Sequence, residues 1–206
     1  MIKFEFTDTC GWMGAIRGMR NPLNSWDKSD TPYRFDGVPF IGGNDLDLMK
    51  KLSRAGADHG KFLRMIHVQV DIVAPLYWWK EFDTYKVGTV SNSCSTMHKI
   101  HAAELTPQDF SIEKINTPFG KKAFEDVLRS VEQTRKRYLE TESKEDWDEL
   151  IQMLPSSYNQ RRTVDLNYQV LKNMHLARRN HKLSEWHDFC AWCESLPYFT
   201  EICVEM

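Results

Sequence analysis

The residues of this chain with the strongest signs of a binding function lie in the stretch from position 68 to position 98. Residues 74–82, APLYWWKEF, are mostly apolar and aromatic, whereas residues 83–98 are rich in Gly, Ser, Thr and Asn and have little to bury. A segment with few apolar side chains cannot contribute to a hydrophobic core. When it directly follows a segment that belongs to the core, it commonly forms a binding loop on a rigid scaffold. We therefore predict a ligand-binding loop at residues 83–98.

A second candidate for chemistry is the pair His67 and Asp71, which lie on one face of an alternating apolar and polar run. Val68, Val70 and Ile72 occupy the other face, so the run predicts a strand with one buried and one polar face. An imidazole and a carboxylate on the same face of a strand could act together as a general acid and a general base. Two polar residues on a solvated face explain the same pattern.

A third candidate is the sequence Cys190-Ala-Trp-Cys193 with His187 before it, which has metal-ligand types at helical spacing. A structural zinc site normally has four ligands, usually from two such pairs. Core packing of one Cys pair on an amphipathic helix is the better interpretation, and we predict no metal site.

The sequence lacks the motifs of a serine hydrolase and of a glycine-rich phosphate-binding loop, which excludes these two classes. Ser91, Ser93 and Ser95 have no neighbouring His-Asp arrangement of the kind that activates a serine nucleophile. The sequence also has no glycine-rich phosphate loop of the Rossmann or Walker type.

Basic side chains gather around the C-terminal third, and both a solvated helix face and a binding surface fit them. They are Arg161, Arg162, His175, Arg178, Arg179 and His181.

The elements that position these residues are predicted from hydrophobic period and capping signals. Strands are expected at residues 2–6 and 66–73. Helices are expected at residues 9–19, 45–55 with Asn44 as N-cap, 76–82, 119–139, 143–154, 163–179 and 184–196. Strands early and helices late indicate an α+β, or mixed α/β, fold in one domain over residues 1–206.

The segment 23–43 is rich in Pro, Gly and Asp, with Trp26, Tyr33, Phe35 and Phe40 interleaved. A long irregular segment inside a compact domain is usually functional or disordered. The aromatic residues favour a loop packed by their side chains.

Composition narrows the class of partner. The chain has 206 residues, a formal net charge of -2 and 41% hydrophobic residues. We therefore expect neither a nucleic acid nor a membrane as partner. The N-terminal residues MIKFEFTDTC lack a secretion pattern, and the 5 cysteines are an odd number that suits reduced thiols, so a cytoplasmic location is expected.

Three blocks in order resemble the flavin-dependent thymidylate synthase (ThyX) family. Residues 44–66, NDLDLMKKLSRAGADHGKFLRMI, are similar to an Asp-led helix, a Gly-His turn, a Phe and a strand. APLYWWKEF and SNSCSTMH fall where the family has a strand ending in Pro, an Arg-Gln pair and the signature Arg-His-Arg-x-x-Ser-x-Asn-x-x-Ser-x-Arg-Tyr. Residues 154–186 are similar to the block that carries Leu-Pro, Tyr, Asn and a downstream Arg.

The signature departs from the family in its charged part. With Asn92 and Ser95 as anchors, Tyr85, Lys86 and Val87 replace Arg-His-Arg. Lysine supplies charge there without the bidentate geometry of arginine.

The resemblance implies roles for specific residues. Arg178 or Arg179, which the register does not separate, would polarise the pyrimidine base as the family's downstream Arg does. Ser91, Asn92 and Ser95 would shape the nucleotide pocket, and Lys80, Lys86 and His98 would meet phosphates. The remaining expected nucleotide or cofactor contacts are His59, Glu81 and Asn167.

The resemblance also implies a central, largely antiparallel sheet flanked by long helices, and a homotetramer with sites shared between subunits. The expected cofactor is FAD, with dUMP as acceptor and NADPH and methylenetetrahydrofolate as co-substrates of a reductive methylation. The alternative is a non-catalytic protein of this fold that binds a nucleotide as a sensor or sequestering protein.

Overall fold

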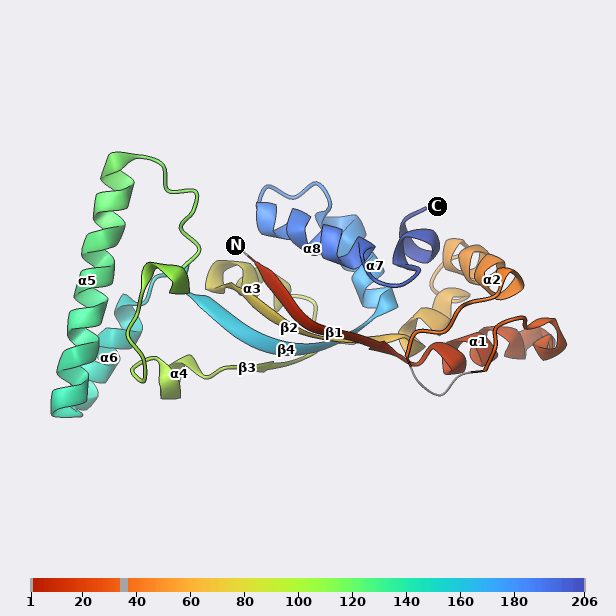
Figure 1. The fold of residues 1–206 in the computed structure, drawn as a ribbon, viewed down its shortest axis with the longest axis horizontal. Coiled ribbons are helices and arrows are strands. Elements are labelled where there is room, and N and C mark those ends of the chain that lie inside the picture. Colours follow the sequence, from red (N-terminus) through yellow and green to blue (C-terminus); the bar gives the residue numbers. More distant parts are fainter. Residues whose placement is uncertain (1, 34–36, 206) are drawn as a thin grey trace. The chain divides into compact units, whose positions relative to one another are not determined.

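The computed structural model describes residues 2–33 and 37–205 and contains a sheet of four strands (Figure 1). The strands are β1 (Lys3–Cys10), β2 (His67–Pro75), β3 (Val90–Ser93) and β4 (Asn159–Asn167). The sheet is antiparallel, with the order β1-β2-β4-β3. The predicted α+β class, with an antiparallel sheet and long helices, is confirmed.

Eight α-helices accompany the strands in the described part of the chain: α1 (Trp12–Arg20), α2 (Gly43–Arg54), α3 (Leu76–Phe82), α4 (Thr96–Lys99), α5 (Pro118–Thr141), α6 (Lys144–Met153), α7 (Tyr168–Arg178) and α8 (Ser184–Glu194). Among the residues described, no helix combines the length and the apolar character needed to cross a membrane.

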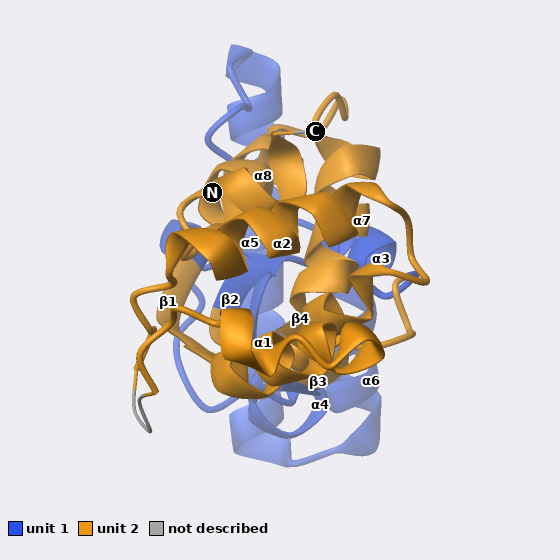
Figure 2. Cartoon of the chain, turned by 90° about the vertical axis from the view of Figure 1, so that its right-hand side faces the viewer, with its two compact units in different colours: residues 1–3, 72–84, 92–162 blue, residues 4–71, 85–91, 163–206 orange. Residues whose placement is uncertain are grey.

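Contacts divide the chain into two compact units, which Figure 2 distinguishes by colour. Unit 1 comprises residues 1–3, 72–84 and 92–162; unit 2 comprises residues 4–71, 85–91 and 163–206. All four strands contribute residues to both units. The single domain expected from the sequence stays a prediction.

In unit 2, helix α8 packs on strand β1 through aromatic side chains. The rings of Phe4 and Trp192 stack at 4.7 Å between centroids, and the Trp192 indole donates a hydrogen bond to Thr7. Stacked aromatic pairs add to the stability gained by burial alone. In unit 1, α5 and α6 lie side by side (Figure 1) and enclose a small core that includes Val131 and Leu150.

Strand β2 follows its sequence pattern closely. Val68, Val70 and Ile72 are almost completely buried, as the alternation predicts. The predicted helix 163–179 is wrong in its first part, because β4 continues to Asn167 before α7 begins. Val164 and Leu166 are both buried, and this spacing of two fits a strand.

The predicted loop 83–98 contains two short elements, β3 and α4. All four side chains of β3 are exposed, so no hydrophobic pattern announces the strand. In unit 1, the backbone N–H of the next residue, Cys94, donates to the carbonyl of Arg161. This bond extends the pairing with β4 by one residue beyond β3.

In the described part of the loop 23–43, two carboxylates, those of Asp30 and Asp45, make hydrogen bonds that fix its course. Trp26, Tyr33 and Phe40 are each more than half exposed, and the predicted Phe35 lies outside the described residues. The carboxylate of Asp30 accepts hydrogen bonds from the first N–H groups of α2, so the predicted Asn44 cap is wrong. A side chain outside the helix takes over the capping role.

Asp45 is the buried centre of this arrangement. Its carboxylate lies 2.6 Å from Arg20 and accepts hydrogen bonds from the hydroxyl groups of Ser29 and Thr31. Burial alone would raise the pKa of Asp45, but these hydrogen bonds outweigh it and hold the pKa below its ordinary value. The ionised carboxylate therefore ties residues 29–31 to α1 and α2.

Candidate functional site

The predicted site residues are divided between the two units. Those in unit 1 are Lys80, Glu81, Asn92, Ser95 and His98; those in unit 2 are His59, Lys86, Ser91, Asn167, Arg178 and Arg179. Each group is described within its own unit.

In unit 2, a turn at Gly88 brings the segment 85–91 against the start of α7. Gly88 has φ +76°, and a Cβ there would lie 2.9 Å from the Asn167 amide nitrogen and 3.0 Å from the Val170 side chain. Glycine suits the position because other residues rarely adopt such a φ and because no room remains for a side chain. The turn thereby places the segment that carries Lys86 and Ser91 beside Asn167.

Arg178 is held by two aromatic residues of the same unit. Its Nε–H donates to the hydroxyl oxygen of Tyr85 at 2.8 Å. Its guanidinium carbon lies 4.6 Å from the ring centroid of Trp186 and 5.4 Å from that of Tyr85. Contacts of a cation with an aromatic face contribute about 0.5–2 kcal/mol each. Arg178 is therefore a positive charge with a defined orientation.

The structure separates Arg178 from Arg179. Arg179 follows the last residue of α7, is exposed, and its backbone N–H donates to the His175 carbonyl. Arg178 is half-buried against Tyr85 and Trp186. The two adjacent arginines therefore differ in that the side chain of Arg178 lies against aromatic rings, whereas that of Arg179 is exposed.

Sequence reasoning missed Tyr85 and Trp186 as the residues that hold Arg178. Tyr85 is 93 residues away from Arg178 in the chain, so no local spacing links the two. The available signal was the chemistry of aromatic residues near a candidate arginine, because guanidinium groups stack on aromatic faces.

The surface of the segment 85–91 combines polar and apolar groups. Lys86 and Ser91 are exposed, and so are Val87 and Val90, which are 89% and 69% exposed. A ligand with both an aromatic ring and charged groups has partners of both kinds here.

Two predicted site residues act as helix caps. Asn167 is buried, and its side-chain oxygen accepts the Val170 N–H at 3.1 Å at the start of α7. Ser95 accepts the His98 N–H at 3.2 Å at the start of α4 in unit 1. Each cap satisfies a donor that the helix itself cannot pair.

The other predicted residues of unit 1 lie at the surface. Lys80, Asn92 and His98 are exposed, and Glu81 is half-buried on α3, where its backbone carbonyl accepts from Thr84. The side chains of Lys80, Asn92 and His98 are accessible to a ligand.

His59 lines a cavity of about 390 Å³ within unit 2. Most of its walls are apolar and come from α1, α2 and the turns around them, including Met19, Leu48 and Phe62. Such a cavity suits a largely apolar group with a polar end near the imidazole.

The polar faces of β2 and β4 form cross-strand pairs in unit 2. His67 lies 3.0 Å from Asp165, and Thr163 donates to Asp71 at 2.6 Å. His67 and Asp71, the predicted acid–base pair, thus each form a hydrogen bond with a residue of β4. This arrangement is typical of an exposed sheet face.

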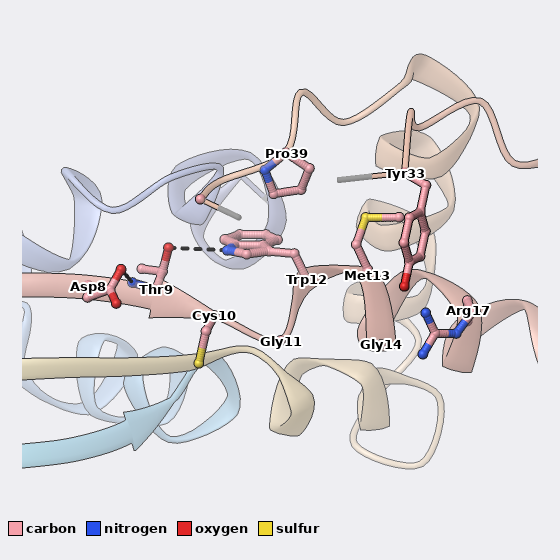
Figure 3. A pocket seen from close by; sticks show the side chains of 11 residues that line it. Asp8, Thr9, Cys10, Gly11, Trp12, Met13, Gly14, Arg17, Tyr33 and Pro39 are labelled. Atoms are coloured by element: carbon pink, nitrogen blue, oxygen red, sulfur yellow. Dashed lines mark hydrogen bonds between the residues drawn. The ribbon is translucent and has the colours of Figure 1, made fainter. Parts of the chain in front are cut away.

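A polar cavity of about 310 Å³ lies where β1 meets α1 (Figure 3). Asp8 and Cys10 reach it from β1, Arg17 from α1, and Tyr33 and Pro39 from the loop between α1 and α2. None of the predicted site residues lines it.

Helix α8 buries both cysteines of the sequence Cys190-Ala-Trp-Cys193, as expected for core packing. Burial raises the pKa of the Cys190 thiol to about 11, so the thiol is protonated at neutral pH. The Nε2–H of His187 donates to the backbone carbonyl oxygen of His181 at 2.7 Å. In the described ranges, no group of three or more His, Cys, Asp or Glu side chains could hold a metal ion.

Comparison of the fold with solved structures gives a consistent match. A crystal structure of thymidylate synthase X (ThyX) from Helicobacter pylori with FAD and dUMP aligns with a TM-score of 0.73 and 17% identity, covering 99% of this chain and 96% of that one. The chain has the ThyX fold. A second Helicobacter pylori ThyX structure with FAD and dUMP gives a TM-score of 0.69 at 17% identity, over 99% of this chain and 97% of that one.

The ThyX resemblance drawn from the three sequence blocks is therefore confirmed for the fold. Neither a family model nor a curated protein matches the sequence. The chain thus shares its fold with these two ThyX structures at 17% sequence identity.

Proposed function

We propose that this chain is a ThyX-like protein that binds a pyrimidine nucleotide such as dUMP together with FAD. The fold supports this, because both similar structures hold FAD and dUMP. The observation that carries the proposal is the fixed guanidinium of Arg178, held by Tyr85 and Trp186. Proteins of one fold can differ in function, so the argument depends on this site and not on the fold alone.

Arg178 would polarise the pyrimidine. A guanidinium stays charged at every physiological pH, and beside a carbonyl oxygen it stabilises negative charge that develops there. Because its position is fixed before the ligand binds, little reorganisation accompanies the reaction. Ser91 on the same unit would contribute to the nucleotide pocket. Asn92 and Ser95, in unit 1, stay predicted nucleotide contacts.

The segment 85–91 fits a flavin by its chemistry. Lys86 offers a positive charge for phosphate, Ser91 a hydroxyl group, and the exposed Val87 and Val90 apolar surface for a ring system. When bound, FAD supplies the hydride chemistry that these side chains lack. Lys80 and His98 are the further phosphate partners in this proposal, with Glu81, Asn167 and His59 as additional cofactor or nucleotide contacts.

The proposal includes a specific reaction and a specific assembly. The reaction would be a reductive methylation of the uracil base with NADPH and methylenetetrahydrofolate as co-substrates, in a homotetramer with shared sites. Light scattering tests the assembly separately: a monomer at micromolar concentration would contradict shared sites.

The experiment is flavin reconstitution followed by absorbance. The purified protein is incubated with FAD, freed of unbound flavin by gel filtration, and titrated with dUMP. We expect a retained flavin band whose shape changes on addition of dUMP. A protein that retains no FAD and gives no dUMP-dependent change under any condition would contradict the proposal.

A non-catalytic nucleotide-binding protein of this fold is the second candidate. It is favoured by the replacement of Arg-His-Arg with Tyr85, Lys86 and Val87, since Lys86 alone retains a charge there. The two candidates differ in turnover. Nucleotide binding without any dTMP from dUMP, folate and NADPH would favour the sensor or sequestering protein.

A further inference from the structure

The contacts around Arg178 restrict its guanidinium in two independent ways. The Trp186 ring lies against the planar group at 4.6 Å and so limits its tilt. The Nε–H bond to the Tyr85 hydroxyl group, at 2.8 Å, fixes the group within its own plane. Once the Nε edge is held, the directions of the two terminal amino groups follow from the rigid fork of the guanidinium.

Tyr85 is itself held in place. Its ring meets the Trp186 ring edge-on at 6.2 Å between centroids, and the Thr89 hydroxyl group donates to the Tyr85 carbonyl oxygen. The crowded turn at Gly88 lies between these two residues and packs on Asn167. The phenol oxygen is therefore part of a fixed frame that joins segment 85–91 to α7.

Tyr85 occupies a position that is positively charged in the family that the chain resembles. In the register anchored on Asn92 and Ser95, Tyr85 falls on the first Arg of the Arg-His-Arg signature of the resembling family. The chain thus has a neutral residue in the loop, and this residue holds a charged residue of a distant helix. Beside the charge of Lys86, the segment thus has a second positively charged group, which α7 supplies.

We propose that Tyr85 is a positioning residue, which orients Arg178 for nucleotide recognition through the phenol–Nε hydrogen bond. The orientation itself is a property of the protein alone, while its effect on nucleotide binding rests on the proposed function. The phenol oxygen does not touch the ligand in this scheme. Its removal should weaken binding only through Arg178.

The first test measures the orientation without any ligand. The protein is labelled with ¹⁵N at arginine Nε, and the Arg178 signal in its NMR spectrum is assigned by its absence in Arg178→Lys. We expect this signal to show slow proton exchange and an upfield ring-current shift. In Tyr85→Phe, which removes one oxygen atom, the exchange should become faster and the shift smaller. Tyr138→Phe on α5 is the matched control and should leave the signal unchanged.

An Arg178 signal in the wild-type protein with fast exchange and no ring-current shift would overturn the proposal whether or not the variant folds. An unchanged signal in folded Tyr85→Phe, verified by circular dichroism, would overturn it equally.

The second test measures dUMP binding by calorimetry in the presence of FAD. We expect Tyr85→Phe to raise the dissociation constant about tenfold, the loss typical of one hydrogen bond to a charged group. FAD retention should remain as in the wild type. Arg178→Met should bind dUMP more weakly than Tyr85→Phe, because it removes the charge itself.

The outcomes separate the two claims. Wild-type protein that binds no dUMP contradicts the proposed function, and the arginine spectrum still decides the role of Tyr85. Normal dUMP binding by Tyr85→Phe, with binding lost in Arg178→Met, overturns the role of Tyr85 and leaves the proposed function standing.

Discussion

Two arginines of this molecule lie on tryptophan rings, but one of them also bonds to a carboxylate and the other to a phenol. In unit 1, Arg162 lies 4.2 Å from the ring centroid of Trp79 and 2.7 Å from a carboxylate oxygen of Asp83. In unit 2, Arg178 lies 4.6 Å from the ring centroid of Trp186, and its Nε–H is bonded to a phenol.

The difference indicates different roles. The carboxylate of Asp83 compensates the charge of Arg162, which makes this arginine a link between β4 and the end of α3. The phenol and the aromatic rings that contact Arg178 are neutral groups and orient its guanidinium. An arginine oriented by neutral groups can still stabilise negative charge on a ligand, so an aromatic contact alone does not distinguish a structural from a functional arginine.

A third arginine extends the comparison to full burial. Arg20 and Asp45 form an ion pair at 2.6 Å, and both side chains are buried. Because removal of one partner leaves a buried charge, Asp45→Asn should lower the free energy of unfolding by about 3–5 kcal/mol. Urea denaturation at neutral pH measures this loss, with the exposed Asp47→Asn on the same helix as control.

The same carboxylate makes a prediction about pH. The folded-state pKa of Asp45 is lowered, so its contribution is complete above the unfolded-state pKa of about 4 and is lost as the pH falls toward the folded-state value. Asp45→Asn should remove this part of the acid sensitivity. An identical pH dependence in variant and wild type would contradict the proposed role of the ionised carboxylate.

The turn at Gly88 tests how the Arg178 region is assembled. Gly88→Ala combines an unfavourable φ with a collision at Asn167, and we expect a loss of about 2–3 kcal/mol in unfolding free energy and weaker dUMP binding. Gly56→Ala is the matched control, because φ is +101° there but the space is open. It should cost about 1 kcal/mol and leave binding intact. Equal losses in both variants would show that packing on Asn167 is unimportant.

Arg162→Met sharpens the contrast between the two tryptophan-bound arginines. It removes the contact with Trp79 and the bond to Asp83, and should lower the free energy of unfolding by about 1–3 kcal/mol. Arg179→Met, at an exposed position, should change stability by less than about 0.5 kcal/mol. Thermal denaturation compares the two, and a stability of Arg162→Met equal to the wild type would remove its structural role.

Lys86→Ala should have the smallest effect. An exposed charge in contact with a phosphate contributes about 0.2–1 kcal/mol, so FAD should bind roughly two- to fivefold more weakly, and less so at high salt. Lys51→Ala on α2 is an exposed control outside the segment. Unchanged FAD affinity at low salt would exclude Lys86 as a phosphate partner.

Elements with a strong hydrophobic period were predictable from the sequence. The buried face of β2 and the helices α5 and α6 follow their apolar spacing. Strand β3 has four exposed side chains, and its pairing with β4 depends on residues far away in the chain, so no local signal marks it. Residues 163–167 were misassigned because two apolar residues spaced by two fit a helix that continues into α7 as well as a strand.

The site was predictable in its residue types but not in its geometry. Arg178 and Arg179 are adjacent and equivalent in the sequence; tertiary contacts with Tyr85 and Trp186 distinguish them. The helix-cap roles of Asn167 and Ser95 likewise depend on where α7 and α4 begin.

The most direct test of the central claim, that Arg178 recognises the nucleotide, is equilibrium dialysis of labelled dUMP against FAD-treated protein. Wild type, Arg178→Met and Arg162→Met are compared under one set of conditions. We predict that Arg178→Met loses about tenfold to a hundredfold in affinity, as expected for charged hydrogen bonds, while folded Arg162→Met binds within about twofold of the wild type. Equal dUMP affinity of the wild type and Arg178→Met would contradict the account.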